Sequence, residues 1–275
     1  MIGCCSSRGT LVPIIEYLQP LAVPFAFVLA RILGLFLFTP LLSSTVVPSQ
    51  FKALFAFLFA IAIFPGAMRH GFPQAAVLDL ATIGMVMFGE LLIGVVLGLL
   101  AGLPIAALQM GGFIMGYQMG LGLAQAYNPE MDGSDDVISQ LLFFMGIAVY
   151  IAAGGLDSVF VALLGTFERV PVGAFTSQQV PLDLYVSILA SGLELAVRVA
   201  TPVLGVILLA LLAMGFVMKT MPQINILSVG FAAKIVAGLS MLTVSVGAVD
   251  LALREDLFVT LDQVLGWVDS LGGSR

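Results

Sequence analysis

The side chains that could do chemistry in this chain are few, and most of them interrupt apolar sequence. Arg31, Glu90, Glu194, Arg198 and Lys234 all lie within hydrophobic stretches. In a membrane such charges are costly, and they usually mark an ion pathway or a buried partner. Because they occur in sets of opposite sign rather than as an unpaired acid, a structural clamp is favoured over a proton relay.

Two ion pairs are predicted from sign and spacing. Glu194 and Arg198 are four residues apart, so they share one face of a helix and can neutralise each other. Arg31 and Glu90 carry opposite charges at similar depth in two different apolar segments. We therefore expect Arg31 and Glu90 to pair across a helix bundle.

A short acidic loop invites a calcium interpretation, which its spacing does not support. Its four carboxylates surround a Gly-Ser pair: Glu130, Asp132, Asp135 and Asp136. The loop lacks the twelve-residue alternation and the terminal glutamate of an EF-hand. A solvated loop is therefore expected.

Other catalytic and metal-ligating groups are scarce. The cysteines, Cys4 and Cys5, are adjacent near the N-terminus, and the single histidine, His70, lies in a loop-like segment. Two thiols without a histidine make no zinc site, and no His/Asp/Glu cluster has ligand spacing. We predict no metal, no cofactor and no enzymatic activity.

The composition is that of a multi-pass membrane protein or of a subunit that is buried in an apolar assembly. Apolar residues make up 60% of the 275 and charged residues only 9%, with a mean hydropathy of +1.15. A soluble domain carries about 25% charged residues. The formal net charge of −6 argues against nucleic acid as a partner.

The hydrophobic pattern predicts an all-α chain with broken helices, which forms one integral domain over residues 1–275. Gly102 and Pro104 are expected to break a long uncharged run, and residues 250–275 to form a separate amphipathic helix because their apolar residues have helical spacing. The expected helices cover residues 21–38, 51–64, 78–103, 105–126, 137–152, 156–167, 184–215 and 226–249.

A glycine- and methionine-rich stretch, Gln109 to Pro129, lies in the middle of the chain. Glycine lets neighbouring backbones approach closely, and methionine is an adaptable apolar side chain. Such a segment suits either small-residue packing between membrane helices or a deformable constriction. The residues alone favour helix packing.

Four stretches together resemble the FliR/SctT export-gate family of type III secretion, in its flagellar branch. They are ARILGLFLFTPLLSSTVVPSQFKALFAF (30–57), GELLIGVVLGLLAGLP (89–104), MGGFIMGYQMGLGLAQAYNP (110–129) and MPQINILSVGFAAKI (221–235). The third and fourth are specific as a pair, and the match extends over most of residues 25 to 240. One departure is GGLDS after the fourth apolar segment, where many relatives carry a histidine.

The resemblance implies a fold of helical hairpins and a subunit of a helical gate in the bacterial inner membrane, at the base of the flagellum. Its implied partners are FliP-like and FliQ-like membrane subunits, an FlhB-like export switch protein, membrane lipid and exported unfolded polypeptides. By position in the third motif it assigns the constriction to Phe113, Met115, Tyr117 and Met119, and a flexible gate backbone to Gly111, Gly112, Gly116 and Gly120. Structural and subunit-packing positions are Arg31, Pro40, Pro48, Glu90, Pro222, Gln223, Asn225 and Lys234.

Two alternatives to the flagellar gate remain. The same motifs occur in the injectisome branch of the family, which is separated from the flagellar branch only by small differences. A small-molecule secondary transporter is disfavoured because the chain has neither a clear inverted repeat nor an unpaired ionisable residue at a broken helix.

Overall fold

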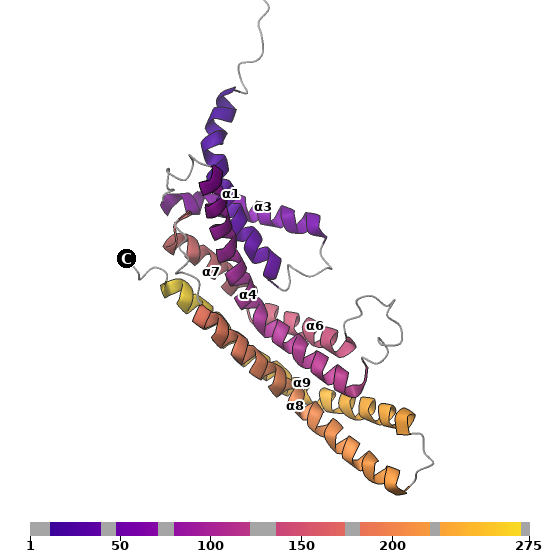
Figure 1. Ribbon diagram of the computed structural model, residues 1–275. Helices are drawn as coiled ribbons and strands as arrows, with labels where there is room; N and C mark the ends of the chain where they lie inside the picture. Colours follow the sequence, from indigo (N-terminus) through magenta and orange to yellow (C-terminus); the bar gives the residue numbers. More distant parts are fainter. Residues whose placement is uncertain are drawn as a thin grey trace, which may run out of the picture. The chain divides into compact units, whose positions relative to one another are not determined.

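The chain is all-α in the computed structural model, which describes residues 12–39, 48–70, 80–121, 136–173, 182–220 and 226–270. No strand occurs in these ranges, so the predicted fold class is confirmed (Figure 1). The elements are α1 (Val12–Phe38), α3 (Ser49–Ala67), the short 3₁₀ helix η1 (Met68–His70), α4 (Leu80–Met119), α6 (Val137–Ala152), α7 (Gly155–Arg169), α8 (Leu182–Thr220) and α9 (Ile226–Ser270).

Several of these helices can cross a membrane. By length and composition five qualify, and a sixth span results if α6 and α7 count as one broken span. The predicted multi-pass class is therefore confirmed. The helices α4, α8 and α9 contain 40, 39 and 45 residues. At about 1.5 Å per residue a straight helix of that size is roughly twice as long as the ~30 Å hydrocarbon core.

Two predicted helix breaks are wrong. Helix α4 continues through Gly102 and Pro104. Proline fixes a φ that a helix accepts and removes a single hydrogen bond, and the neighbouring Ala101 and Ile105 are buried. The predicted C-terminal helix is instead the end of α9, which runs unbroken from Ile226 to Ser270.

A buried apolar stripe runs along the C-terminal part of α9. Its five members are almost completely buried: Leu253, Leu257, Leu261, Val264 and Val268. They follow helical spacing along α9, so each lies on the face that packs against the rest of the chain. Burial of this stripe explains why α9 continues past the acidic residues between its members.

The break between α6 and α7 was predicted and is present. Helix α6 ends at Ala152, and the turn that follows contains Gly154 with φ +74°, which favours glycine. At Gly155, a Cβ would lie 2.7 Å from the ring of Tyr150. A side chain there would collide with the ring, so both glycines fit their positions.

The chain, expected as one domain, consists of two compact units. Unit 1 comprises residues 1–99, 159–181 and 264–275, and unit 2 comprises residues 100–158 and 182–263. One boundary between the units lies inside α4, close to Gly102 and Pro104. Each unit has its own interior, and each holds one part of the predicted site.

Candidate functional site

The ion pair predicted between Arg31 and Glu90 is present in unit 1. The Nε of Arg31 donates to Oε2 of Glu90 over 2.6 Å, and both side chains are 0% exposed. Arg31 lies on α1 and Glu90 on α4, so the pair joins two helices that are distant in sequence. Removing either charge would leave the other one buried.

Three further groups contact the guanidinium of Arg31. Its guanidinium donates to Oγ1 of Thr166 over 3.2 Å and to the carbonyl of Val170 over 3.4 Å. It also lies 4.3 Å from the centre of the Phe167 ring, in cation–π geometry. The network therefore fastens α1 and α4 to the end of α7.

Glu90 is held on its other side as well. The backbone N–H of Gly173 donates to its Oε1 over 2.8 Å. Both carboxylate oxygens thus have partners, as a buried charge requires. The partners from residues 166 to 173 could not be predicted from the sequence, because no local pattern marks them and only the fold brings them to the ion pair.

Glycines let α1 and α4 approach beside this ion pair. A Cβ at Gly94 would lie 2.8 Å from the backbone nitrogen of Leu35, and one at Gly34 would lie 2.8 Å from that of Val95. Real Cβ atoms essentially never come so close, so the helices touch through their backbones. Gly34 is three residues after Arg31 and Gly94 four after Glu90, which puts the close approach one helical turn from the charges.

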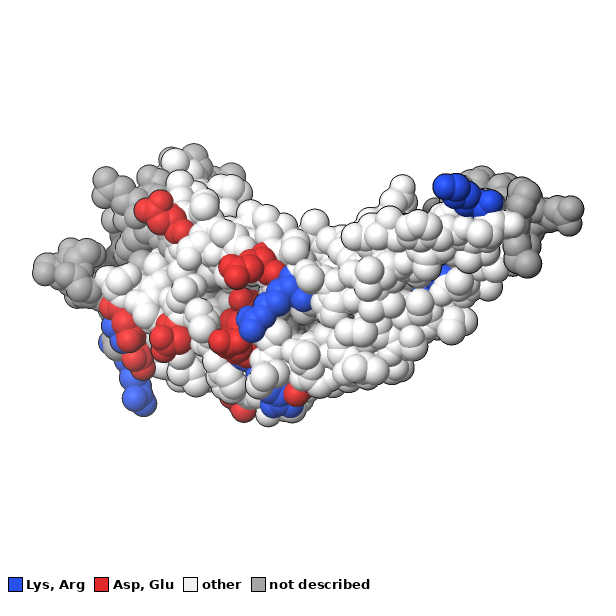
Figure 2. Space-filling view, turned by 90° about the horizontal axis from the view of Figure 1, so that it is seen from below, with Lys and Arg blue, Asp and Glu red and all other residues white. Residues whose placement is uncertain are grey.

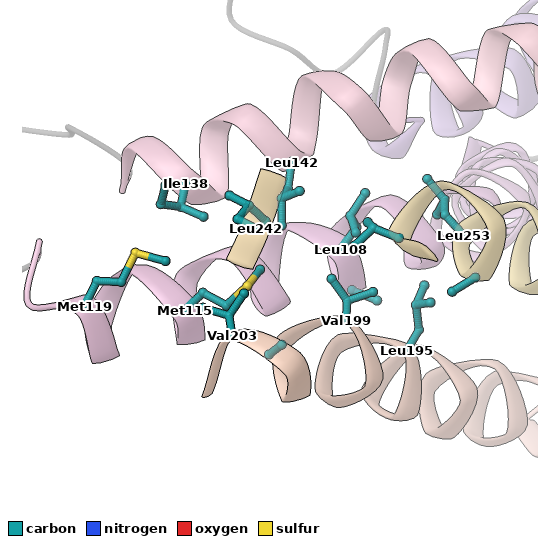
Figure 3. Close-up of a cluster of buried hydrophobic side chains, with 14 of the residues drawn as sticks. Leu108, Met115, Met119, Ile138, Leu142, Leu195, Val199, Val203, Leu242 and Leu253 are labelled. Atoms are coloured by element: carbon teal, nitrogen blue, oxygen red, sulfur yellow. The ribbon is translucent and has the colours of Figure 1, made fainter. Parts of the chain in front are cut away.

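The predicted constriction residues divide between two faces of α4. Met115 and Met119 are 0% exposed and belong to the hydrophobic core of unit 2, as Figure 3 shows. Phe113 and Tyr117 point away from that core, with 55% and 71% of their surface exposed. Their rings stack with centroids 6.5 Å apart, so they form an exposed aromatic pair.

Glycines of this stretch mediate close packing between helices. This is the interpretation that the residues alone favoured over a deformable constriction. A Cβ at Gly111 would lie 2.9 Å from the carbonyl oxygen of Ala196 on α8, and one at Gly112 would lie 2.6 Å from Cα of Ser139 on α6. At Gly116 a Cβ would overlap the carboxylate of Asp136. These three positions lie inside a continuous helix that is fixed against its neighbours.

Gly120 follows the last residue of α4 and terminates the helix. Its φ is +90°, and its N–H donates to the carbonyl of Tyr117. The N–H of Leu121 donates to the carbonyl of Gly116, which completes the pattern of a Schellman motif. A residue other than glycine would be strained there.

Asp136 departs from the solvated loop that the sequence predicts. It lies at the start of α6, is 8% exposed, and packs its carboxylate against Gly116. Its Oδ2 has no hydrogen-bond partner in the described part of the chain. The remaining members of the acidic loop, Glu130, Asp132 and Asp135, lie outside the described residues.

A pH-dependent stability follows for Asp136, which precedes the apolar segment of α6. Burial raises the pKa of its carboxyl above 3.8, and the backbone N–H groups at the start of α6 partly offset this. Ionised Asp136 therefore destabilises the fold as the pH rises from 3.8 through the raised pKa. Asp136→Asn should increase the thermal midpoint at neutral pH and leave it unchanged below that range. A shift equal at every pH, or equal to that of the exposed Asp183→Asn control, would contradict this.

The remaining predicted residues have simpler placements. Pro48 precedes α3, and its carbonyl accepts the N–H of Phe51 over 3.0 Å. On α9 the Nζ of Lys234 lies 5.8 Å from the centre of the Phe231 ring. Four predicted positions lie outside the described residues: Pro40, Pro222, Gln223 and Asn225.

The predicted pair of Glu194 with Arg198 is wrong. Nη1 of Arg198 instead contacts Oε2 of Glu255 on α9, at 3.4 Å. Helix α9 packs beside α8 and offers a carboxylate across the helix–helix contact. A partner on the neighbouring helix thus replaces the one within α8.

Comparison with known proteins adds the family. The sequence model of bacterial export proteins, family 1, matches residues 22–257. The chain belongs to this family. This export protein is 26% identical to the flagellar biosynthetic protein FliR of Bacillus subtilis, an alignment that covers 91% of this chain and 96% of that protein. It is 28% identical to the FliR of Caulobacter vibrioides, over 86% of this chain and 94% of that protein.

A protein with a translocation name is similar as well. The Yop proteins translocation protein T of Yersinia pestis is 23% identical, over 78% of this chain and 82% of that protein. The resemblance stated from the four motifs is therefore confirmed. This bacterial export protein is a multi-pass membrane component of a type III export apparatus.

Proposed function

We propose that the chain is a pore-lining, non-enzymatic subunit of the flagellar export gate. In this role it acts with FliP-like, FliQ-like and FlhB-like proteins to pass unfolded polypeptides across the inner membrane. The flagellar branch is preferred to the injectisome branch because the flagellar relatives of Bacillus and Caulobacter align over a larger share of this chain. Loss of flagella, rather than of an injectisome, in a deletion strain would support that choice.

One observation carries the proposal: the exposed pair of Phe113 and Tyr117 projects from a helix that is anchored on its other face. The anchor consists of Met115 and Met119 in the core of unit 2 and of the close contacts at the glycines. Apolar side chains on a rigid support can exclude water and ions and still yield to a passing polypeptide. In this arrangement the aromatic pair forms the seal, and the buried methionines support it.

The seal can be tested in cells that make the complete export apparatus. Phe113→Ala with Tyr117→Ala should produce a severalfold increase in ion leak or dye entry, because the exposed aromatic surface is removed while the core of unit 2 is untouched. Phe88→Ala is the matched control, since Phe88 is also an exposed aromatic residue of α4, at 63%. Membranes that stay tight, with normal assembly, would place the seal elsewhere.

Met115→Ala should behave differently. Met115 is 0% exposed, so its truncation removes core contacts and lowers stability by about 2–5 kcal/mol. The expected result is less assembled complex rather than a leak. This difference separates a support residue from a sealing one.

A further inference from the structure

A charged band crosses α8 and α9, two helices that are otherwise strongly apolar. In unit 2 these helices run antiparallel, since Ser191 contacts Asp256 while Met214 lies against Gly230. Helix α8 has no charged residue between Arg198 and Lys219. Figure 2 shows acidic and basic side chains gathered in one region, with mostly uncharged surface elsewhere on that face.

A pocket of about 180 Å³ opens in this band. Leu195 and Ala252 are buried and supply an apolar part of its wall. Its polar lining comes from both helices: Ser191, Glu194, Arg198, Glu255 and Asp256. A cleft that takes a whole small molecule measures about 300–1,000 Å³, so this pocket suits the end of a single side chain.

The charges inside the pocket do not balance. Its lining contains three carboxylates and a single guanidinium, that of Arg198, which is shared with Glu255 at 3.4 Å. The hydroxyl of Ser191 donates to Oδ1 of Asp256 over 2.9 Å. The other oxygen, Oδ2, is buried and has no hydrogen-bond partner in the described residues. The pocket therefore has unused acceptors and excess negative charge.

The surface beside the pocket is the kind that another protein covers. Large apolar side chains adjoin the charged residues on both helices and are about half exposed or more: Leu193, Val197, Leu251, Phe258 and Val259. Acidic residues within apolar helices require a partner, whether in a neighbouring protein or in a water-filled path. Lipid can cover the apolar side chains but supplies no cation for the carboxylates, whereas a helix of another protein can supply both an apolar face and a basic side chain.

We propose that this pocket binds a lysine or arginine side chain from a helix of a neighbouring membrane subunit. The cation fills the pocket, satisfies the carboxylate oxygens, and balances the excess charge through charge-assisted hydrogen bonds. The apolar side chains around it pack against the same helix. The inference rests on the proposal that the chain works within a multi-subunit gate, but it does not depend on the seal at Phe113.

The test is to purify the complex through a tag on this chain and to quantify the co-purified membrane proteins. Neutralising the pocket with Glu194→Gln, Glu255→Gln and Asp256→Asn should reduce one membrane subunit by roughly tenfold or more, because a desolvated ion pair is lost. The control is Asp183→Asn with Asp262→Asn, two exposed carboxylates on the same helices. If the neutralised chain unfolds, Glu194→Gln alone replaces it, since this side chain is exposed and the change preserves its shape.

Zero-length carbodiimide cross-linking of the unmodified complex gives a second measurement. A cross-link from a pocket carboxylate to a lysine of another protein supports the inference, and so does loss of a subunit on neutralisation. An unchanged subunit content after neutralisation overturns it, as does a cross-link to an aminophospholipid alone. If the unmodified chain itself co-purifies with no other membrane protein, the proposed function fails first, and this outcome is distinct from failure of the pocket.

Discussion

Replacing Arg31 by methionine is expected to lower the free energy of unfolding by about 3–5 kcal/mol, because an uncompensated charge then stays buried. Glu90 is 0% exposed, so its carboxylate has no access to water once the guanidinium is removed. Methionine keeps most of the aliphatic volume of Arg31, which separates the loss of charge from the creation of a cavity. The thermal midpoint in detergent and the amount of chain in membranes are the measurements.

The double variant Arg31→Met with Glu90→Gln should be more stable than Arg31→Met alone. Glutamine is neutral, and it still accepts the N–H of Gly173. Arg254→Met is the control, because Arg254 forms a partly exposed pair with Asp250 at 3.0 Å. That change should cost less than about 1 kcal/mol. Strict additivity of the effects at 31 and 90 would reject the pairing as a source of stability.

The outcome at these charges shows what a sequence can predict about a buried site. Opposite signs at similar depth were sufficient to predict the pair of Arg31 with Glu90. The contacts from Thr166 and Phe167 were not predictable, because their approach depends on how α7 packs in unit 1. Local spacing also misled at Arg198, where a carboxylate on the neighbouring helix is the partner.

The central stretch shows a second limit. Its composition identified residues 109–129 as important for packing, and the close contacts of Gly111 and Gly112 agree with that. Composition could not assign the large side chains to faces, since glycines at irregular intervals obscure the helical period. The helix continues through these glycines and through Pro104, because packing against neighbouring helices outweighs weak local helix preference.

Gly94→Ala should also lower the free energy of unfolding strongly, because it separates α1 from α4 at the turn beside the ion pair. The nearest atoms to the new Cβ belong to the backbone of Arg31 and Leu35, so no side-chain rotation can make room. The strain should cost about 1–3 kcal/mol or more, measured as a lower thermal midpoint. On the same helix, a Cβ at Gly84 meets no atom within 4 Å, so Gly84→Ala is the matched control. The free energy of unfolding of the Gly84→Ala control should rise by about 0.5–1 kcal/mol, since alanine is the better helix former.

Gly94→Ala and Arg31→Met should also be non-additive. A backbone shift at Gly94 also moves Glu90, one turn away, and lengthens the 2.6 Å contact between Arg31 and Glu90. The ion pair is therefore already weakened in Gly94→Ala, and its removal by Arg31→Met costs less there than in the unchanged protein. Equal effects of Gly94→Ala and Gly84→Ala would show that α1 and α4 do not need backbone contact. Full additivity with Arg31→Met would show that glycine packing and the ion pair stabilise unit 1 independently. We expect each single variant to lose much of the stability of unit 1 and the double variant to lose less than the sum of the two. Such a result would mean that two opposite charges can be buried in so apolar a chain because the glycines let α1 and α4 come close.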